Sequence, residues 1–186
     1  MKVEAMSKNK EPGMGMLVAV LTSISLITAL LLGLVNMVTA PQIKINTEKK
    51  TAEAMQAVLP AESYEDVTAD YTGGDASILA ISKAGEEGYV VRVKPATSFS
   101  GTLSVMVGVA GDGTCTGISI VETGETSGLG SNAGKPDWQA QFVGKSGTVS
   151  VSKDGGDIQA LTGATITSRG VCESVTSALA AAASLG

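Results

Sequence analysis

The sequence predicts an α+β protein, with one N-terminal transmembrane helix followed by a single domain that has a mainly antiparallel sheet and flanking helices. Three observations predict this class. An uncharged apolar run near the N-terminus is long enough to span a bilayer, several β-branched segments separated by Gly-rich turns follow it, and an amphipathic helical pattern closes the chain. Because the strands follow one another without intervening helices, a doubly wound fold is not expected.

The apolar run predicts a helix that crosses the lipid bilayer. No charged residue occurs from residue 13 to residue 43, and residues 14–40 are rich in Leu, Val, Ile and Met. A helix rises about 1.5 Å per residue, so about 20 apolar residues are sufficient to cross the hydrocarbon core. The alternative is a signal peptide cleaved after Val38-Thr39-Ala40, which is disfavoured because the run is longer than an ordinary h-region and Pro41 would follow the cut.

The charges on the two sides of this segment leave its orientation open. Three lysines precede the segment and three follow it, so the excess of positive charge that marks the cytoplasmic side nearly cancels. These residues are Lys2, Lys8, Lys10, Lys44, Lys49 and Lys50. We therefore expect a tail at 1–13, a transmembrane helix at 14–40, a linker at 41–60 and one domain at 61–186.

Each later element is predicted from its own pattern. Thr47 to Leu59 consists of good helix formers and stops before Pro60, which predicts a helix in the linker. The Asp112-Gly113 pair predicts a hairpin turn between two strands. The predicted strands are Ile78 to Ser82, Gly88 to Lys94, Thr102 to Ala110, Thr116 to Glu122 and, more weakly patterned, Thr148 to Ser152.

The last segment, Thr167 to Leu185, predicts an amphipathic helix. Its apolar residues recur at helical spacing, so they form one face that can pack on the sheet. That face consists of Val171, Val175, Ala178, Leu179 and Ala182.

The composition excludes several classes of function. The formal net charge of −5 disfavours binding to nucleic acid, which requires clustered Lys and Arg. The sequence contains no His, so the commonest general base and metal ligand is missing. Cys115 and Cys172 form no CxxC pair, so no metal site is predicted, and two buried free thiols are favoured over a disulfide. Redox chemistry in this chain would require a cofactor.

A turn rich in small and hydroxyl residues precedes the last helix and is the candidate site. A helix N-terminus offers unpaired N–H groups and a positive dipole end, so this position suits a phosphate. The alternative is that Thr167 or Ser168 only caps the helix, as such residues commonly do. The candidate residues are Thr162, Gly163, Ala164, Thr165, Thr167 and Ser168.

These residues resemble a known signature. Thr162-Gly163-Ala164-Thr165, followed by Ile166-Thr167-Ser168, is similar to the [S/T]GAT-x-[S/T] motif of FMN-binding domains in the G subunit of the Rnf electron transport complex and the C subunit of the sodium-translocating NADH:quinone reductase. The resemblance implies that Thr165 is esterified to the phosphate of FMN. It also implies that a separate magnesium-dependent flavin transferase makes this bond from FAD.

A second segment resembles the same family. Glu125-Thr126-Ser127-Gly128-Leu129-Gly130, with Trp138 and Phe142 downstream, is similar to the family pattern ETPGLG…W…F. We expect Glu125, Thr126, Gly128, Leu129 and Gly130 to form the opposite wall of the flavin site, whereas Trp138 and Phe142 are expected to pack in the core. The chain departs from the family pattern at Gln159, where Asp is common, at Ser127, where Pro is usual, and at Gly124, where a basic residue or His is frequent.

The resemblance implies an electron-relay subunit of an Rnf-type complex. Such a chain would pass electrons between ferredoxin and NAD branches, together with other membrane and peripheral subunits, while the complex transports sodium ions or protons. Its C-terminal domain would lie on the outer face of the cytoplasmic membrane, and it would not be catalytic alone. Two alternatives remain: a stand-alone extracytosolic flavin reductase, and an assembly protein that never receives FMN. Because only 3% of residues are aromatic, little stacking on the flavin is expected, and its fluorescence should survive.

Overall fold

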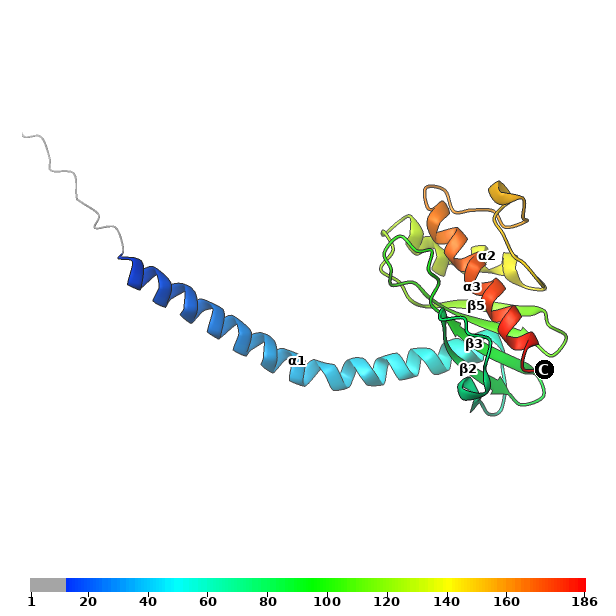
Figure 1. Ribbon diagram of the computed structural model, residues 1–186, viewed down its shortest axis with the longest axis horizontal. Helices are drawn as coiled ribbons and strands as arrows, with labels where there is room; N and C mark the ends of the chain where they lie inside the picture. The colour runs from blue at the N-terminus through cyan, green and yellow to red at the C-terminus, as the bar shows by residue number, and fades with distance from the viewer. Residues whose placement is uncertain (1–12) are drawn as a thin grey trace, which may run out of the picture. The chain divides into compact units, whose positions relative to one another are not determined.

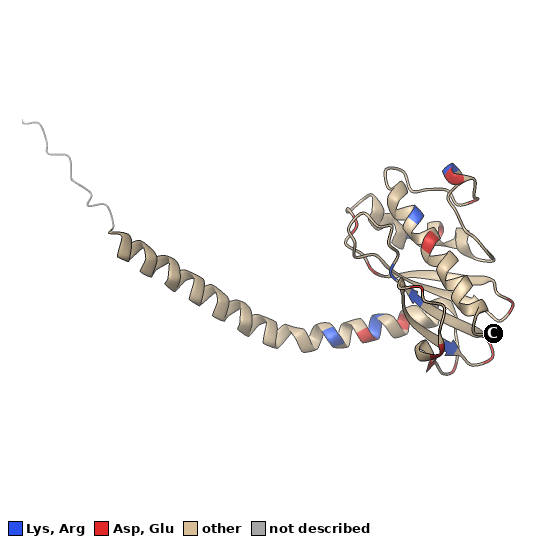
Figure 2. Ribbon diagram, viewed as in Figure 1, with Lys and Arg blue, Asp and Glu red and all other residues tan. Residues whose placement is uncertain are grey.

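The computed structural model describes residues 13–186, and Figure 1 shows the chain. The predicted tail at 1–13 lies outside the described residues except for its last position. The longest element is helix α1, Met14–Val58. Its N-terminal part is long and apolar enough to cross a membrane. Figure 2 shows that this part carries no Lys, Arg, Asp or Glu, whereas charged residues appear in the later turns.

Three hydroxyl side chains in the apolar part of α1 bond to the helix itself. The hydroxyls of Ser23, Thr28 and Thr39 donate to backbone carbonyls one turn earlier, at 2.7, 2.8 and 2.9 Å. This satisfies the hydroxyl donors without water, as the hydrocarbon core of a bilayer requires. The helix also continues through Pro41, so the predicted linker helix is the last part of α1 and not a separate element. Proline lacks the backbone donor that would bond to residue 37, yet the helix continues beyond it to Val58.

The C-terminal part of the chain, Glu48–Gly186, forms one compact unit. It contains a five-stranded sheet in the order β1-β2-β3-β4-β5, in which all neighbours are antiparallel. This confirms the predicted α+β class. The strands are β1 Glu65–Asp66, β2 Ile78–Ala84, β3 Gly88–Val93, β4 Ser104–Ala110 and β5 Cys115–Glu122.

The predicted hairpin joins β4 to β5. The carboxylate of Asp112 accepts from the N–H of Thr114 at 3.0 Å, and Gly113 has a φ of 79°, a conformation that glycine adopts without strain. The hairpin places β4 in the sheet interior, where six of its seven residues are buried.

Two helical segments cover the two faces of the sheet. Helix α3, Thr165–Ala183, packs on β3 and β4 and buries the apolar face that the sequence predicts, including Val171 and Val175. The last turns of α1 cover the other face through Ala54 and Val58. A Cβ at Gly108 of β4 would lie 2.5 Å from the carbonyl oxygen of Val58, so only glycine lets the end of α1 approach this strand so closely.

Short helical turns connect β5 to α3. They are η2 Gly130–Gly134, α2 Pro136–Gln139, η3 Ala140–Phe142 and η4 Ser152–Asp154, and a further turn, η1 Thr68–Asp70, follows β1. Phe142 is fully buried, and its ring lies 5.2 Å from that of Trp138 in an edge-to-face arrangement. The prediction that these two rings pack in the core is confirmed.

The predicted strand at Thr148–Ser152 is wrong. Only Val151 pairs, in a single parallel bridge with Ile158. The turn η4 begins at the next residue and is followed by Gly155, whose φ is 88°, so the chain reverses before a second residue can pair. The short β-branched pattern in this segment therefore reflects buried side chains and not pairing in a β-sheet.

Helix α3 begins two residues before the predicted start. Its N-cap is Ala164, which has no side-chain hydrogen bond to the helix, and Thr167 and Ser168 lie inside the first turn. The alternative in which one of these two residues only caps the helix is therefore wrong.

Cys115 and Cys172 are free and buried, as predicted. Burial raises the pKa of Cys115 to about 11. Burial, together with the charge of Asp154, raises the pKa of Cys172 to about 12. Both groups therefore remain thiols at neutral pH, which makes them poor nucleophiles.

Candidate functional site

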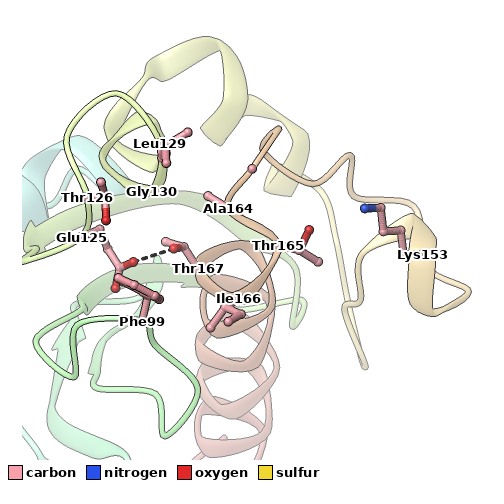
Figure 3. Close-up of a pocket in the computed structure, with 11 residues that line it drawn as sticks. Phe99, Glu125, Thr126, Leu129, Gly130, Lys153, Ala164, Thr165, Ile166 and Thr167 are labelled. Atoms are coloured by element: carbon pink, nitrogen blue, oxygen red, sulfur yellow. Dashed lines mark hydrogen bonds between the residues drawn. The ribbon is translucent and has the colours of Figure 1, made fainter.

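A pocket of about 430 Å³ lies between the start of α3 and the loop that follows β5. This volume is in the range that binds small molecules and cofactors. Figure 3 shows the lining side chains. They are Phe99, Glu125, Thr126, Leu129, Gly130, Lys153, Gly163, Ala164, Thr165, Ile166 and Thr167.

A tight turn delivers the chain to the start of α3. The N–H of Ala164 donates to the carbonyl of Leu161 at 3.0 Å, and Gly163 occupies the third position of the turn with a φ of 75°. A type II turn requires this positive φ, which explains the glycine. A Cβ at Gly163 would also lie 3.1 Å from Cδ2 of Leu129, so glycine allows the two predicted segments to meet.

The three hydroxyl residues at the start of α3 have different surroundings. The Thr167 hydroxyl donates to Oε2 of Glu125 at 2.6 Å, across 42 residues of sequence. The Ser168 hydroxyl donates to the Ala164 carbonyl at 3.0 Å and accepts from the N–H of Leu161 at 2.9 Å. The Thr165 hydroxyl makes no hydrogen bond to any residue from 13 to 186, and its side chain is half-buried in the pocket wall. Of these three hydroxyls, that of Thr165 is therefore the one available to a ligand.

The first turn of α3 presents unpaired donors to the same pocket. The first helical bond runs from the N–H of Ser168 to the carbonyl of Ala164 at 3.0 Å, so the N–H groups of Thr165, Ile166 and Thr167 have no intrahelical acceptor. These donors and the positive end of the helix dipole favour an anion at this position. Lys153 contributes the basic side chain of the lining. The geometry fits a phosphate group held beside Thr165.

Glu125 connects the loop after β5 to two other segments. It is 8% exposed. Besides the Thr167 hydroxyl, it accepts from the N–H and the hydroxyl of Ser100 at 3.2 and 3.1 Å. Burial alone would raise the pKa of Glu125, but the hydrogen bonds from Thr167 and Ser100 outweigh it, so this pKa lies below its usual value. Glu125 is therefore a buried carboxylate whose negative charge is stabilised by hydrogen-bond donors.

The structure brings eight of the eleven predicted site residues into the pocket lining. Gly128, Thr162 and Ser168 lie outside it. Gly128 has a φ of 77° and shapes the loop, with its N–H donating to the hydroxyl of Ser131 at 2.9 Å. Thr162 is exposed in the turn, and Ser168 is fully buried, where its hydroxyl braces that turn.

Sequence reasoning missed Phe99, Lys153 and Ile166. Phe99 and Lys153 come from loops that no motif marks, so only the fold brings them to the pocket. Ile166 lies inside the recognised motif between two hydroxyl residues, and its 48% exposure was the missing information. An apolar residue placed between two hydroxyl residues of a recognised motif is the sequence signal that could have identified Ile166.

The position of Gln159 is set by its backbone. Its N–H donates to Oε1 of Gln141, and its carbonyl accepts from Nε1 of Trp138, both at 2.8 Å. The side chain is exposed. Gln at this position, where the family commonly has Asp, therefore keeps the hydrogen bonds that hold the backbone before the motif.

Comparison with known proteins assigns the class of this domain. Residues 98–180 match the FMN-binding domain family. This stretch includes all residues that line the pocket, from Phe99 to Thr167. The fold and the site therefore define an FMN-binding domain, and the long apolar helix joined to it indicates a membrane-anchored protein.

Relatives of similar length assign the particular family. The chain is 35% identical over 177 residues to the G subunit of the Na(+)-translocating ferredoxin:NAD(+) oxidoreductase complex of Acetobacterium woodii, covering 84% of this chain and 85% of that protein. It is 31% identical to the G subunit of the ion-translocating oxidoreductase complex of Methanosarcina acetivorans, with 94% and 96% covered. The corresponding Escherichia coli protein is 36% identical, with 70% and 77% covered. The chain belongs to the family of G subunits of Rnf-type ion-translocating oxidoreductase complexes, which confirms the resemblance found in the sequence.

Proposed function

We propose that this chain is an electron-relay subunit of an Rnf-type complex that carries FMN as a phosphoester on the hydroxyl of Thr165. The observation that supports this proposal best is that the Thr165 hydroxyl is unbonded within residues 13–186 and lines the pocket, whereas the hydroxyls of Thr167 and Ser168 are engaged. Bound FMN would supply the redox chemistry that the side chains of this pocket lack.

The attachment reaction makes defined demands on Thr165. Its oxygen forms a bond to the FMN phosphorus of FAD, the bond between the two phosphates breaks, AMP leaves and the hydroxyl proton is released. A hydroxyl that already donates within the fold would first have to break that bond. We assign activation of the hydroxyl to a separate flavin transferase, because no group within residues 13–186 accepts a hydrogen bond from it.

The remaining residues have binding roles in this proposal. The first-turn N–H groups and Lys153 offset the negative charge of the phosphoester. Gly163 and Gly130 keep the backbone close to the ligand, and Leu129 contributes an apolar wall. A Cβ at Gly130 would lie 2.7 Å from the Thr167 hydroxyl oxygen and 2.8 Å from Glu125, so a larger residue would disturb the bond between these two side chains.

We further propose that residues 14–40 span the cytoplasmic membrane, that residues 41–60 link this span to the domain, and that residues 61–186 lie on the outer face. A covalent link suits that location. A reversibly bound cofactor dissociates when the surrounding concentration is low, whereas a phosphoester retains it at any concentration. The relatives are named as subunits of ion-translocating oxidoreductase complexes, so we propose other subunits of such a complex as partners.

The proposal is tested by the intact mass of the full chain, co-expressed with a flavin transferase and denatured to remove loosely held flavin. We expect the wild type to gain about 438 Da, the mass of FMN less one water lost on ester formation. Thr165→Ala should gain nothing, whereas Thr165→Ser, which keeps a hydroxyl, should be modified. Thr148→Ala is the matched control, since Thr148 is exposed and lies outside the pocket. If neither the wild type nor this control gains mass, the chain is instead a binding or assembly protein.

A further inference from the structure

An exposed aromatic side chain stands at the wall of the pocket. Phe99 is 68% exposed and comes from the connection between β3 and β4, which no predicted motif includes. Single exposed apolar residues are common on protein surfaces and need no function by themselves. What sets Phe99 apart is how the Phe99 loop, residues 96–100, is held.

Two carboxylates hold the Phe99 loop at its two ends. Glu173 of α3 accepts from the N–H groups of Ala96 and Thr97 at 3.0 and 3.2 Å. Glu125, at the other end, accepts from the N–H and the hydroxyl of Ser100 at 3.2 and 3.1 Å. Hydrogen bonds to charged groups are among the stronger ones in proteins.

A glycine of α3 brings the same loop against the helix. A Cβ at Gly170 would lie 1.9 Å from the carbonyl oxygen of Thr97. Only glycine therefore allows the loop backbone to lie directly on α3, one and a half turns after Thr165. Phe99 thus projects from a fixed backbone and not from a freely moving loop.

The side chains around Phe99 define what it can contact. Of the pocket lining, Phe99, Ile166 and Leu129 are apolar and exposed, at 68%, 48% and 43%. Figure 3 shows Phe99 and Ile166 toward one end of the pocket and Leu129 toward the other. A ring carried by a ligand that is tethered by its phosphate at Thr165 would therefore meet an exposed apolar side chain at either end of the pocket.

We infer that Phe99 is the aromatic contact that orients the isoalloxazine ring of FMN, and that Glu125 and Glu173 are positioning residues which hold the Phe99 loop in place for this contact. This inference rests on the proposed attachment at Thr165. It names the side chain on which the ring packs, in an offset or edge-on geometry that aromatic pairs prefer.

The residue types in the lining make a fluorescence test possible. Within residues 13–186, no Trp or Tyr lines the pocket. Phenylalanine is too difficult to oxidise to quench an excited flavin, whereas an indole in contact with the ring donates an electron to it and takes it back without emission. The flavin in the wild type is therefore expected to fluoresce whether or not Phe99 contacts its ring. Wild-type emission does not test that contact.

The experiment uses the full chain in detergent, flavinylated by co-expression and with loading verified by intact mass. Phe99→Trp should lose most of the flavin emission and shorten its lifetime. Leu79→Trp is the matched control, because Leu79 is 46% exposed in β2 and lies outside the pocket, and it should keep the wild-type lifetime. Equal lifetimes in loaded Phe99→Trp and loaded Leu79→Trp would overturn the inference while leaving the attachment at Thr165 intact.

The positioning role has its own test in the Phe99→Trp protein. Adding Glu173→Ala releases the N–H groups of Ala96 and Thr97, so the indole should leave the ring for part of the time. Part of the emission should return, with a broader spread of lifetimes. Adding Glu86→Ala, an exposed glutamate outside the pocket, should change nothing. Emission that stays quenched after Glu173→Ala would exclude the positioning role of Glu173.

Discussion

At the scale of single residues, the bond between Thr167 and Glu125 joins the two motifs that the sequence separates by about 40 positions. It is 2.6 Å long and buried. A buried carboxylate without donors is costly, since hydrogen bonds must replace the lost water. This bond therefore contributes to the stability of the domain as well as to the shape of the pocket.

Replacing Thr167 by Val should lower the free energy of unfolding by about 1.5–3 kcal/mol, the usual range for a hydrogen bond to a charged group. Valine keeps the shape of the side chain and removes only the hydroxyl. The measurement is urea unfolding of the unflavinylated full chain. Thr165→Val is the control, and it should change the free energy by less than about 0.5 kcal/mol, because the hydroxyl that it removes has no partner within residues 13–186. Equal effects of the two changes would contradict this prediction.

The same bond gives the unfolding free energy a defined pH dependence. The hydrogen bonds of Glu125 lower its pKa in the folded state below the usual value, which is about 4.3 in an unfolded chain. The stabilisation is therefore complete above about pH 4.3 and is lost as the pH falls through the folded-state pKa. The difference between wild type and Thr167→Val should stay constant from neutral pH downward and shrink on acidification beyond that point. A difference that persists unchanged in strong acid would exclude an ionised Glu125 as the acceptor.

Individual residues also show how far the sequence could predict the site. Thr165 was found because the family signature is local and contiguous, and Thr167 was named with it. The partner of Thr167 could not be predicted, because the two segments approach each other only after the strands and α3 have packed. Phe99 lies in a loop without a motif, so its exposure beside the pocket is a property of the fold alone.

At the scale of elements, the contact between α3 and the Phe99 loop depends on one glycine. The terminal helix was predicted from the spacing of its apolar face, and glycine inside a helix is usually unfavourable. Its presence at position 170 is explained by the loop backbone that lies against it.

Gly170→Ala should destabilise the domain although alanine is the better helix former. We expect a loss of about 1–3 kcal/mol, as for other overpacked positions. The same change in the flavinylated Phe99→Trp protein should return part of the flavin emission, because the loop must move away from α3. Gly134→Ala serves as the control in urea unfolding, since a Cβ there meets nothing within 4 Å. A Gly170→Ala protein as stable as the wild type would contradict this prediction, because the Phe99 loop would then move away from α3 without a loss of stability.

At the scale of the whole molecule, the question is on which side of the membrane the domain lies. The lysines that flank the apolar run nearly balance, so the chain's charges do not decide it. The proposed location outside the cytoplasm is consistent with the proposed covalent attachment of the cofactor, because a bond retains the cofactor there against dilution.

A reporter enzyme that folds only outside the cytoplasm, such as alkaline phosphatase, should be active when fused after Gly186. A reporter that is active only in the cytoplasm should be inactive at the same position. Deleting residues 14–40 from the fusion removes the membrane segment and should abolish export of the phosphatase. The reverse activity pattern of the two reporters in the full-length fusion would place the domain in the cytoplasm and exclude the proposed topology.

The sequence by itself determined most of the elements and pointed to the residue that we propose for attachment. The apolar run of α1, the alternation in the strands, the helical spacing of α3 and the contiguous signature around Thr165 are all local patterns, which a chain displays before it folds. The tertiary structure decided which side chains share the pocket. Only the packing of α3 on the sheet brings the Phe99 loop, Glu125 and Lys153 to the start of that helix. Among the hydroxyls at the start of α3, it leaves that of Thr165 without a partner within residues 13–186, because Glu125 reaches Thr167 through a contact that the linear order does not contain.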